Sequence, residues 1–218
     1  MNSVMIVANW KSNETEKDAL TWFSAMKPSL DSIEKTIVIC PPATLLSTAF
    51  EQKTSLQLTC AIGAQDISPF AAGAYTGEVN GEQLKEFVTY VIIGHSERRT
   101  YFNEDDSLLA KKVAMAIAYG LIPIFCVQNE QTVIPEGVHI VAYEPVAAIG
   151  TGHADSPDAA NAVAQKIKEK NNDISVLYGG SVTAENVSSF THARDIAGVL
   201  VGGASLHPQE FSQIITHA

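Results

Sequence analysis

The chain has 218 residues, of which 46% are hydrophobic, and a formal net charge of −10. This length suffices for one large α/β domain or two small ones, and the hydrophobic content favours a packed core over disorder. The acidic charge argues against a broad nucleic-acid-binding surface, although a few local N–H dipoles still allow an anionic small molecule to bind. No apolar segment approaches the length of a membrane span, and no low-complexity linker marks a boundary. We therefore expect one domain over residues 1–218 with no nucleic-acid or membrane partner.

Three cysteines, Cys40, Cys60 and Cys126, lie in or beside apolar runs. Their spacing matches no Cys/His metal motif, so we expect no metal site. An odd number of cysteines without a secretory signal is typical of a reducing compartment, and we expect a cytoplasmic protein.

Eight short β-rich runs recur along the chain, and each is almost continuously apolar. Such runs are typical of parallel strands that are covered on both faces. They comprise residues 4–9, 35–41, 56–65, 90–94, 121–127, 138–144, 174–180 and 197–203.

Amphipathic segments follow most of these runs. Helices are expected over 13–26 (with Leu20, Phe23 and Met26), over 104–119, over 156–171, and from His207-Pro208 onward. Strands that alternate with helices in this way predict a (β/α)8 barrel, with a doubly wound open sheet as the alternative. Eight repeats of similar length, without a glycine fingerprint after the first strand, favour the closed barrel.

One connection is too short for its helix. Ten residues, including Pro135, lie between Val127 and Val138. Ten extended residues still span roughly 33 Å, and the return along one strand needs about 17–20 Å. We therefore expect the helix between strands five and six to be missing or reduced to a turn.

Loss of this helix would uncover the outer faces of strands five and six. The candidates for exposure are Ile124, Phe125, Val127 and Ile140. A bare apolar patch favours association, so we expect the short connection, a neighbouring helix or another subunit to cover it.

Polar side chains stand at the ends of three predicted strands. Asn9 and Lys11 follow the first strand, His95 the fourth and Glu144 the sixth. Active sites of such barrels lie at the carboxyl ends of the strands. The segment after His95 can start a short helix, whose N-terminus disfavours protonation of the imidazole. A neutral imidazole can donate one hydrogen bond and accept another. Alone, such a lysine or histidine is more often solvated or structural.

Paired glycines end the last two strands. Gly179-Gly180 stands before Ser181, and Gly202-Gly203 follows the eighth strand. Backbone N–H groups at such pairs can reach an anion, and this end of the barrel is the usual phosphate site. One pair alone could be a tight turn, but two in succession favour an anion site.

Six motifs together resemble those of triosephosphate isomerases. They are NWK (9–11), GAQDISPFAAGAYTGEV (63–79), YVIIGHSERRTYF (90–102), AYEPVAAIGTG (142–152), LYGGSV (177–182) and GVLVGGASL (198–206). They cover almost the whole chain outside the shortened connection. The resemblance implies interconversion of dihydroxyacetone phosphate and glyceraldehyde 3-phosphate without a metal or organic cofactor. The family is itself a standard example of pKa tuning and of closure over a substrate.

The resemblance also implies a role for each site residue. Glu144 would remove the carbon-bound proton, and neutral His95 would move protons between the two oxygens of the enediolate. Lys11 and Asn9 would stabilise the oxyanion, with Glu97 supporting Lys11. The remaining positions would hold the phosphate: Gly150, Ser181, Gly202 and Gly203.

The chain departs from the family pattern at two places. Ala147 stands where the lid, expected over 145–152, usually has tryptophan, which predicts weaker closure and some loss of turnover. Gln128-Asn129 replaces a Gly-Glu pair after strand five, so the support of Arg98 or Arg99 must change. Glu130 is a candidate substitute.

The segment 65–79 resembles the interdigitating loop of the family. Thr76 matches the position that reaches into a partner subunit, so the resemblance implies a homodimer through this loop. A long surface loop on a monomer is the alternative.

Two other functions remain open. A related sugar-phosphate isomerase could use the same phosphate grip with a larger substrate. A barrel that binds phosphate with little turnover is the other, but the presence of Asn9, Lys11, His95 and Glu144 argues against it.

Overall fold

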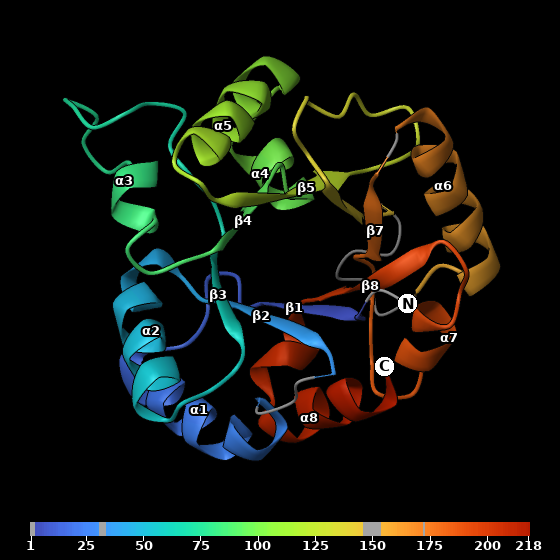
Figure 1. Cartoon of the computed structure of the whole chain (residues 1–218), viewed down its shortest axis with the longest axis horizontal. Coiled ribbons are helices and arrows are strands. Elements are labelled where there is room, and N and C mark those ends of the chain that lie inside the picture. Colours follow the sequence, from blue (N-terminus) through green and yellow to red (C-terminus); the bar gives the residue numbers. More distant parts are fainter. Residues whose placement is uncertain (1–2, 31–33, 146–153, 172) are drawn as a thin grey trace.

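The computed structural model describes residues 3–30, 34–145, 154–171 and 173–218, and these form a closed parallel barrel. Each strand pairs with the next along the chain, and β1 also pairs with β8, which closes the ring (Figure 1). This pairing confirms the predicted (β/α)8 barrel and excludes the open sheet. The strands are β1 (Met5–Asn9), β2 (Thr36–Cys40), β3 (Ala61–Ala64), β4 (Tyr90–Ile93), β5 (Ile122–Val127), β6 (Ile140–Tyr143), β7 (Ser175–Tyr178) and β8 (Ile196–Val201).

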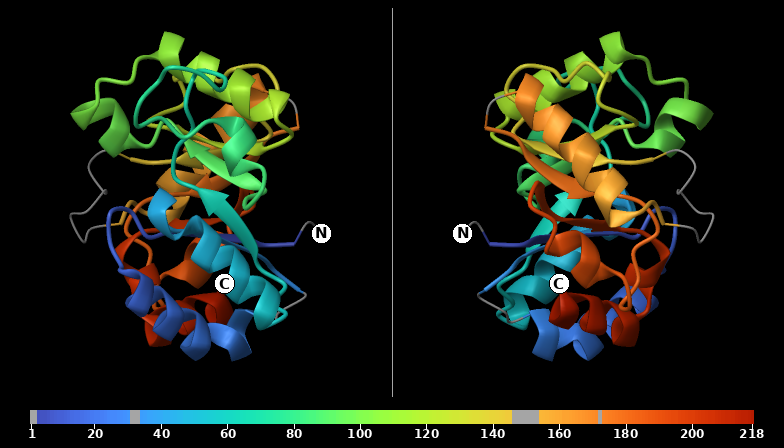
Figure 2. Two further views of the ribbon diagram at one scale, coloured as in Figure 1. Left: turned by 90° about the vertical axis from the view of Figure 1, so that its left-hand side faces the viewer. Right: turned by 90° about the vertical axis from the view of Figure 1, so that its right-hand side faces the viewer.

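Helices surround the strands on the outside of the barrel, as the side views show (Figure 2). They are α1 (Glu16–Leu30), α2 (Leu46–Ser55), α3 (Gly81–Leu84), α4 (Ser96–Tyr101), α5 (Asp106–Ala118), α6 (Pro157–Lys170), α7 (Val187–Thr191) and α8 (Pro208–His217), with 3-10 turns η1 (Ala43–Leu45) and η3 (Gly203–Leu206). Ser156 caps α6 through the N–H of Ala159, and a proline opens α8, as the sequence predicted. The first helix begins three residues later than expected, and Leu20 on it is 41% exposed.

The apolar residues form two layers. A small cluster fills the barrel interior with strand residues such as Val7, Ile92 and Leu177. A larger cluster lies between the strands and the helices, and it includes Trp22, Phe23 and Phe211. Both faces of the strands are therefore buried, which explains why the strand sequences are continuously apolar. Among the described residues, no helix is long and apolar enough to cross a membrane.

The connection from β5 to β6 contains turns and no helix, as predicted. It runs through the gap that this leaves in the outer layer between α5 and α6 (Figure 1). Asn129 organises its first turn by accepting a hydrogen bond from the N–H of Gln131 at 2.8 Å. Lys170 of α6 donates to the carbonyl oxygen of Glu130 at 2.8 Å, and this bond ties the connection to the neighbouring helix.

The outer face of β5 is covered, as expected, although Ile124 is not part of that face. Phe125 and Val127 do point outward, but each is 1% exposed because the outer apolar cluster, with Ile134 of the connection packed on it, covers them. Ile124 points into the barrel interior instead, and Ile140 is half-buried. The short connection and the neighbouring helices thus replace the missing helix within one subunit.

Glu130 does not take over the support of the arginines. Its carboxylate faces Lys166 at 3.4 Å. Arg99 instead pairs with Asp106 at 2.8 Å and donates to the carbonyl oxygen of Gly94 at 3.0 Å. The carboxylate that supports this arginine therefore comes from α5 and not from the β5 end.

Candidate active site

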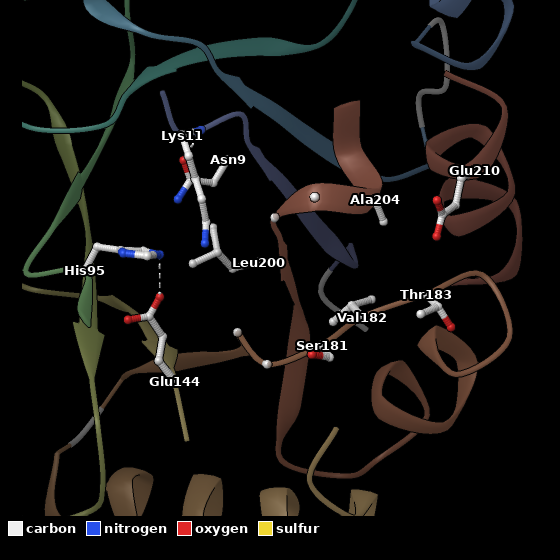
Figure 3. Close-up of a pocket in the computed structure, with 14 residues that line it drawn as sticks. Asn9, Lys11, His95, Glu144, Ser181, Val182, Thr183, Leu200, Ala204 and Glu210 are labelled. Carbon is white, nitrogen blue, oxygen red and sulfur yellow. Dashed lines mark hydrogen bonds and ion pairs between the residues drawn. The ribbon is translucent and has the colours of Figure 1, made fainter. Parts of the chain in front are cut away.

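A pocket of about 260 Å³ opens at the carboxyl ends of the strands. It joins residues from β1, β4, β6, β7 and β8 that are far apart in the sequence (Figure 3). Seven of the residues predicted from sequence line it: Asn9, Lys11, His95, Glu144, Ser181, Gly202 and Gly203.

Glu144 follows β6 and is 1% exposed. Its backbone N–H donates to the carbonyl oxygen of Val127 at 2.8 Å, which continues the β5–β6 pairing and fixes the residue at the pocket wall. One carboxylate oxygen accepts from the N–H of Ser96 at 2.9 Å, and the other lies 3.0 Å from Nε2 of His95. Burial raises the pKa of Glu144 to about 7, and the hydrogen bond from Ser96 partly opposes that rise. Near neutral pH this carboxyl can both take up and release a proton.

His95 stands at the N-cap of α4, and its side chain is 8% exposed. Its Nδ1 accepts a hydrogen bond from the N–H of Glu97 at 3.2 Å. The ring proton must then be on Nε2, which points at Glu144 (Figure 3). Burial lowers the pKa of His95 to about 4, and although Glu97 opposes the shift, Lys11 adds to it. The imidazole is therefore neutral at physiological pH.

Lys11 adopts a backbone conformation that is rare for a residue with a side chain, with φ of 53°. Two polar side chains hold it there. Asn9 accepts from the N–H of Lys11 at 3.0 Å, and Gln65 donates to its carbonyl oxygen at 2.9 Å. The ammonium group lies 2.6 Å from Glu97, so its position is fixed at both ends. The result is a pre-positioned cation facing His95 and Glu144 (Figure 3).

Small residues form the other end of the pocket. Gly202 and Gly203 lead into η3, and Ser181 follows β7. The first N–H groups of a helix have no partner within it, and they can donate to an anion. A Cβ atom at Gly202 would lie 3.4 Å from Cε of Lys11, at ordinary contact distance, so Gly202 lies directly beside the lysine side chain.

Some predicted positions lie outside the described residues, and one lies elsewhere on the surface. Gly150 and Ala147, with most of the expected lid, fall outside the described residues. Thr76 lies on the exposed loop 65–79, away from the pocket lining. Within the described ranges, no three His, Cys, Asp or Glu side chains are grouped to hold a metal ion.

The chain matches the sequence profile of triosephosphate isomerase over residues 4–139 and 136–218. The chain belongs to the triosephosphate isomerase family. The two matched segments meet at 136–139, in the shortened connection between β5 and β6.

Relatives within the triosephosphate isomerase family align over almost the whole chain. The triosephosphate isomerase of Dictyoglomus thermophilum is 39% identical, with 99% of each chain covered. That of Alkaliphilus oremlandii is also 39% identical with 99% of each covered, and that of Gloeothece citriformis is 36% identical with 100% of each covered. The Dictyoglomus alignment has 249 positions, more than the 218 residues of this chain, so the relative contains residues with no counterpart here.

Three roles in this pocket were not predicted from sequence, although Gly179 was expected as part of a glycine pair near an anion. Gln65 orients Lys11, and the N–H of Ser96 holds Glu144. At Gly179 a Cβ atom would approach Cγ of Glu144 to 3.1 Å, so this glycine leaves room for the carboxylate side chain. Gln65 ends the GAQ segment after the third strand. Its contact with Lys11 forms only when the barrel brings the two strand ends together, and a sequence pattern does not reveal such a contact.

Proposed function

We propose that Glu144 is the base by which this member of the triosephosphate isomerase family interconverts dihydroxyacetone phosphate and glyceraldehyde 3-phosphate. The observation that carries the proposal is the pair of titrating groups 3.0 Å apart, with the carboxyl pKa near 7 and the imidazole pKa near 4. Triosephosphate isomerase is itself the standard example of such a carboxylate beside a neutral imidazole.

Glu144 takes the proton from the carbon beside the carbonyl group. A solvated carboxylate is a weak base for this task, and a buried one with a raised pKa is stronger. The resulting carboxylic acid then returns the proton to the adjacent carbon. The bond that breaks is C–H and the electron pair moves into the enediolate, so the reaction needs no oxidant.

His95 and Lys11 stabilise the charge that develops on the enediolate oxygens. Neutral His95 donates its Nε2 proton to one oxygen and receives a proton from the other. Lys11 supplies a fixed positive charge, with Asn9 beside it as a further polar group. The N–H groups of Gly202 and Gly203, together with Ser181, hold the phosphate at the opposite end.

Turnover of glyceraldehyde 3-phosphate by the wild-type chain and by Glu144→Gln tests this mechanism. Loss of a general base typically lowers the rate by about 10²–10⁴-fold, so kcat of the variant should fall by at least about 10²-fold. Glu169→Gln, an exposed acid on α6, is the matched control and should keep wild-type turnover. Wild-type kcat in Glu144→Gln would refute the assignment of the base.

The homodimer is part of the same proposal. The loop 65–79 is closed at its base by a hydrogen bond from the N–H of Ser68 to the carbonyl oxygen of Val79 at 2.9 Å. Phe70 and Tyr75 stack on each other at 4.2 Å, although both are exposed. A cavity of about 310 Å³, lined in part by Lys11, lies beside this loop, and it is where the proposal places a loop tip from a second copy.

Sedimentation of the wild-type chain and of Tyr75→Arg tests the dimer. The wild type should sediment as a dimer, and the variant should shift toward the monomer because a charge replaces an apolar contact. A monomeric wild type at micromolar concentration would refute the dimer while leaving the chemistry of Glu144 unaffected.

A further inference from the structure

The phosphate end of the pocket is bordered by a carboxylate. Glu210 lies in the first turn of α8, is half-buried and lines the pocket together with Thr183 and Ala204. Its carboxylate lies on the side of α8 that faces the pocket (Figure 3). An acid in the first turn of a helix interacts favourably with the helix dipole, which explains why a carboxylate is stable at this position. The dipole does not explain why a carboxylate borders a site for an anion.

No positive charge near this end of the pocket compensates the carboxylate of Glu210 among the described residues. Lys11 is the one lysine or arginine among the described residues that line the pocket, and Glu97 already pairs with it at 2.6 Å. His95 is neutral. Within the described part of the chain, no lysine, arginine or histidine forms an ion pair with Glu210. A phosphate dianion held by the η3 N–H groups therefore shares the pocket with an uncompensated negative charge.

We propose that the carboxylate of Glu210 limits the affinity of the pocket for the phosphate group. The proposal rests on the phosphate-binding end assigned under the proposed function. Substrate and product carry the same phosphate, so the repulsion weakens both equally and acts on binding without acting on the chemical step. It prevents the glycine N–H groups from retaining product, and it raises KM while leaving kcat unchanged.

The test removes the charge of Glu210 but keeps the shape of its side chain. Glu210→Gln should lower KM for glyceraldehyde 3-phosphate and the inhibition constant for inorganic phosphate together, by roughly three- to tenfold at low salt. Its kcat should stay within about twofold of wild type, since the group does not touch the reacting carbons. Glu210→Asp keeps the charge and should stay close to wild type in both constants.

Asp158→Asn is the matched control, because Asp158 is an exposed acid in the first turn of α6 and does not line the pocket. It removes the same net charge from an equivalent helix position and should leave both constants unchanged. The gain from Glu210→Gln should also shrink as salt is raised, because screening weakens repulsion in an open pocket.

Several results would overturn the inference. Unchanged inhibition by phosphate in a folded Glu210→Gln variant, or weaker binding, would show that the carboxylate does not oppose the anion. An equal gain in Asp158→Asn would assign the effect to net charge. If the wild type binds inorganic phosphate without turning over glyceraldehyde 3-phosphate, the proposed function fails instead. Titration calorimetry with inorganic phosphate then still decides whether Glu210 limits anion binding.

Discussion

Replacing Glu144 with glutamine removes the base, but it should also stabilise the folded protein relative to wild type. This difference in stability should grow as the pH rises. Burial raises the pKa of Glu144 from 4.5 to about 7, so the folded state favours the protonated form. The unfolded chain ionises near the ordinary pKa. Between the two values the folded state binds more protons than the unfolded state, and wild-type stability must fall with rising pH.

The size of this effect follows from the pKa. Each pKa unit corresponds to about 1.4 kcal/mol, so full ionisation of Glu144 costs the folded state about 3 kcal/mol. Of this, about 2 kcal/mol is lost between about pH 5.5 and about pH 8. The pKa of His95 is lowered by burial, which has the opposite sign and removes stability toward acid, but His95 is present in both proteins and largely cancels in their difference.

Urea unfolding of wild type and Glu144→Gln at one protein concentration measures this difference. Any packing cost of the amide adds a constant offset, so the change with pH is what matters. The variant should gain about 2 kcal/mol relative to wild type over that range, and the control Glu169→Gln should gain nothing. A difference that does not change with pH would mean that Glu144 is not held in a protonated, buried state.

Two further substitutions probe the packing around the site. At Gly179→Ala, the new methyl group meets Cγ of Glu144 at 3.1 Å and the carbonyl oxygen of Tyr143 at 3.3 Å, so kcat should fall roughly tenfold in a folded protein. Wild-type kcat in Gly179→Ala, measured in a steady-state assay, would contradict the steric argument. Phe125→Ala should destabilise the protein by about 3–5 kcal/mol in urea unfolding because its ring is 1% exposed. A cost below about 1 kcal/mol would mean that the β5 face is open to water.

The sequence predicted structure well where a residue type determines the backbone conformation of its immediate neighbours. Ser156-Pro157 and His207-Pro208 predicted two helix starts, because capping and proline geometry act over a few residues. The strand ends predicted most of the pocket, since parallel strands in a barrel bring their carboxyl ends together. The length of the connection between strands five and six predicted the missing helix, because ten residues can span the return along a strand but cannot also form a helix.

The sequence was uninformative where the answer depends on which face a strand presents. The run at 121–127 is apolar at every position, so it does not reveal that Ile124 points inward while Phe125 points outward. The pairing of Arg99 with Asp106 likewise depends on how α4 and α5 pack, whereas Glu130 was a candidate only because it adjoins Gln128-Asn129. The effect of Ala147 stays a prediction.

Exchange of the carbon-bound hydrogen with solvent tests the role of Glu144 most directly. Wild type and Glu144→Gln are incubated with dihydroxyacetone phosphate in deuterated water, and deuterium at the substrate carbon is followed by NMR. If Glu144 carries the proton, the wild type incorporates deuterium and the glutamine variant incorporates almost none above the uncatalysed rate. Incorporation at the wild-type rate in the variant would contradict the account.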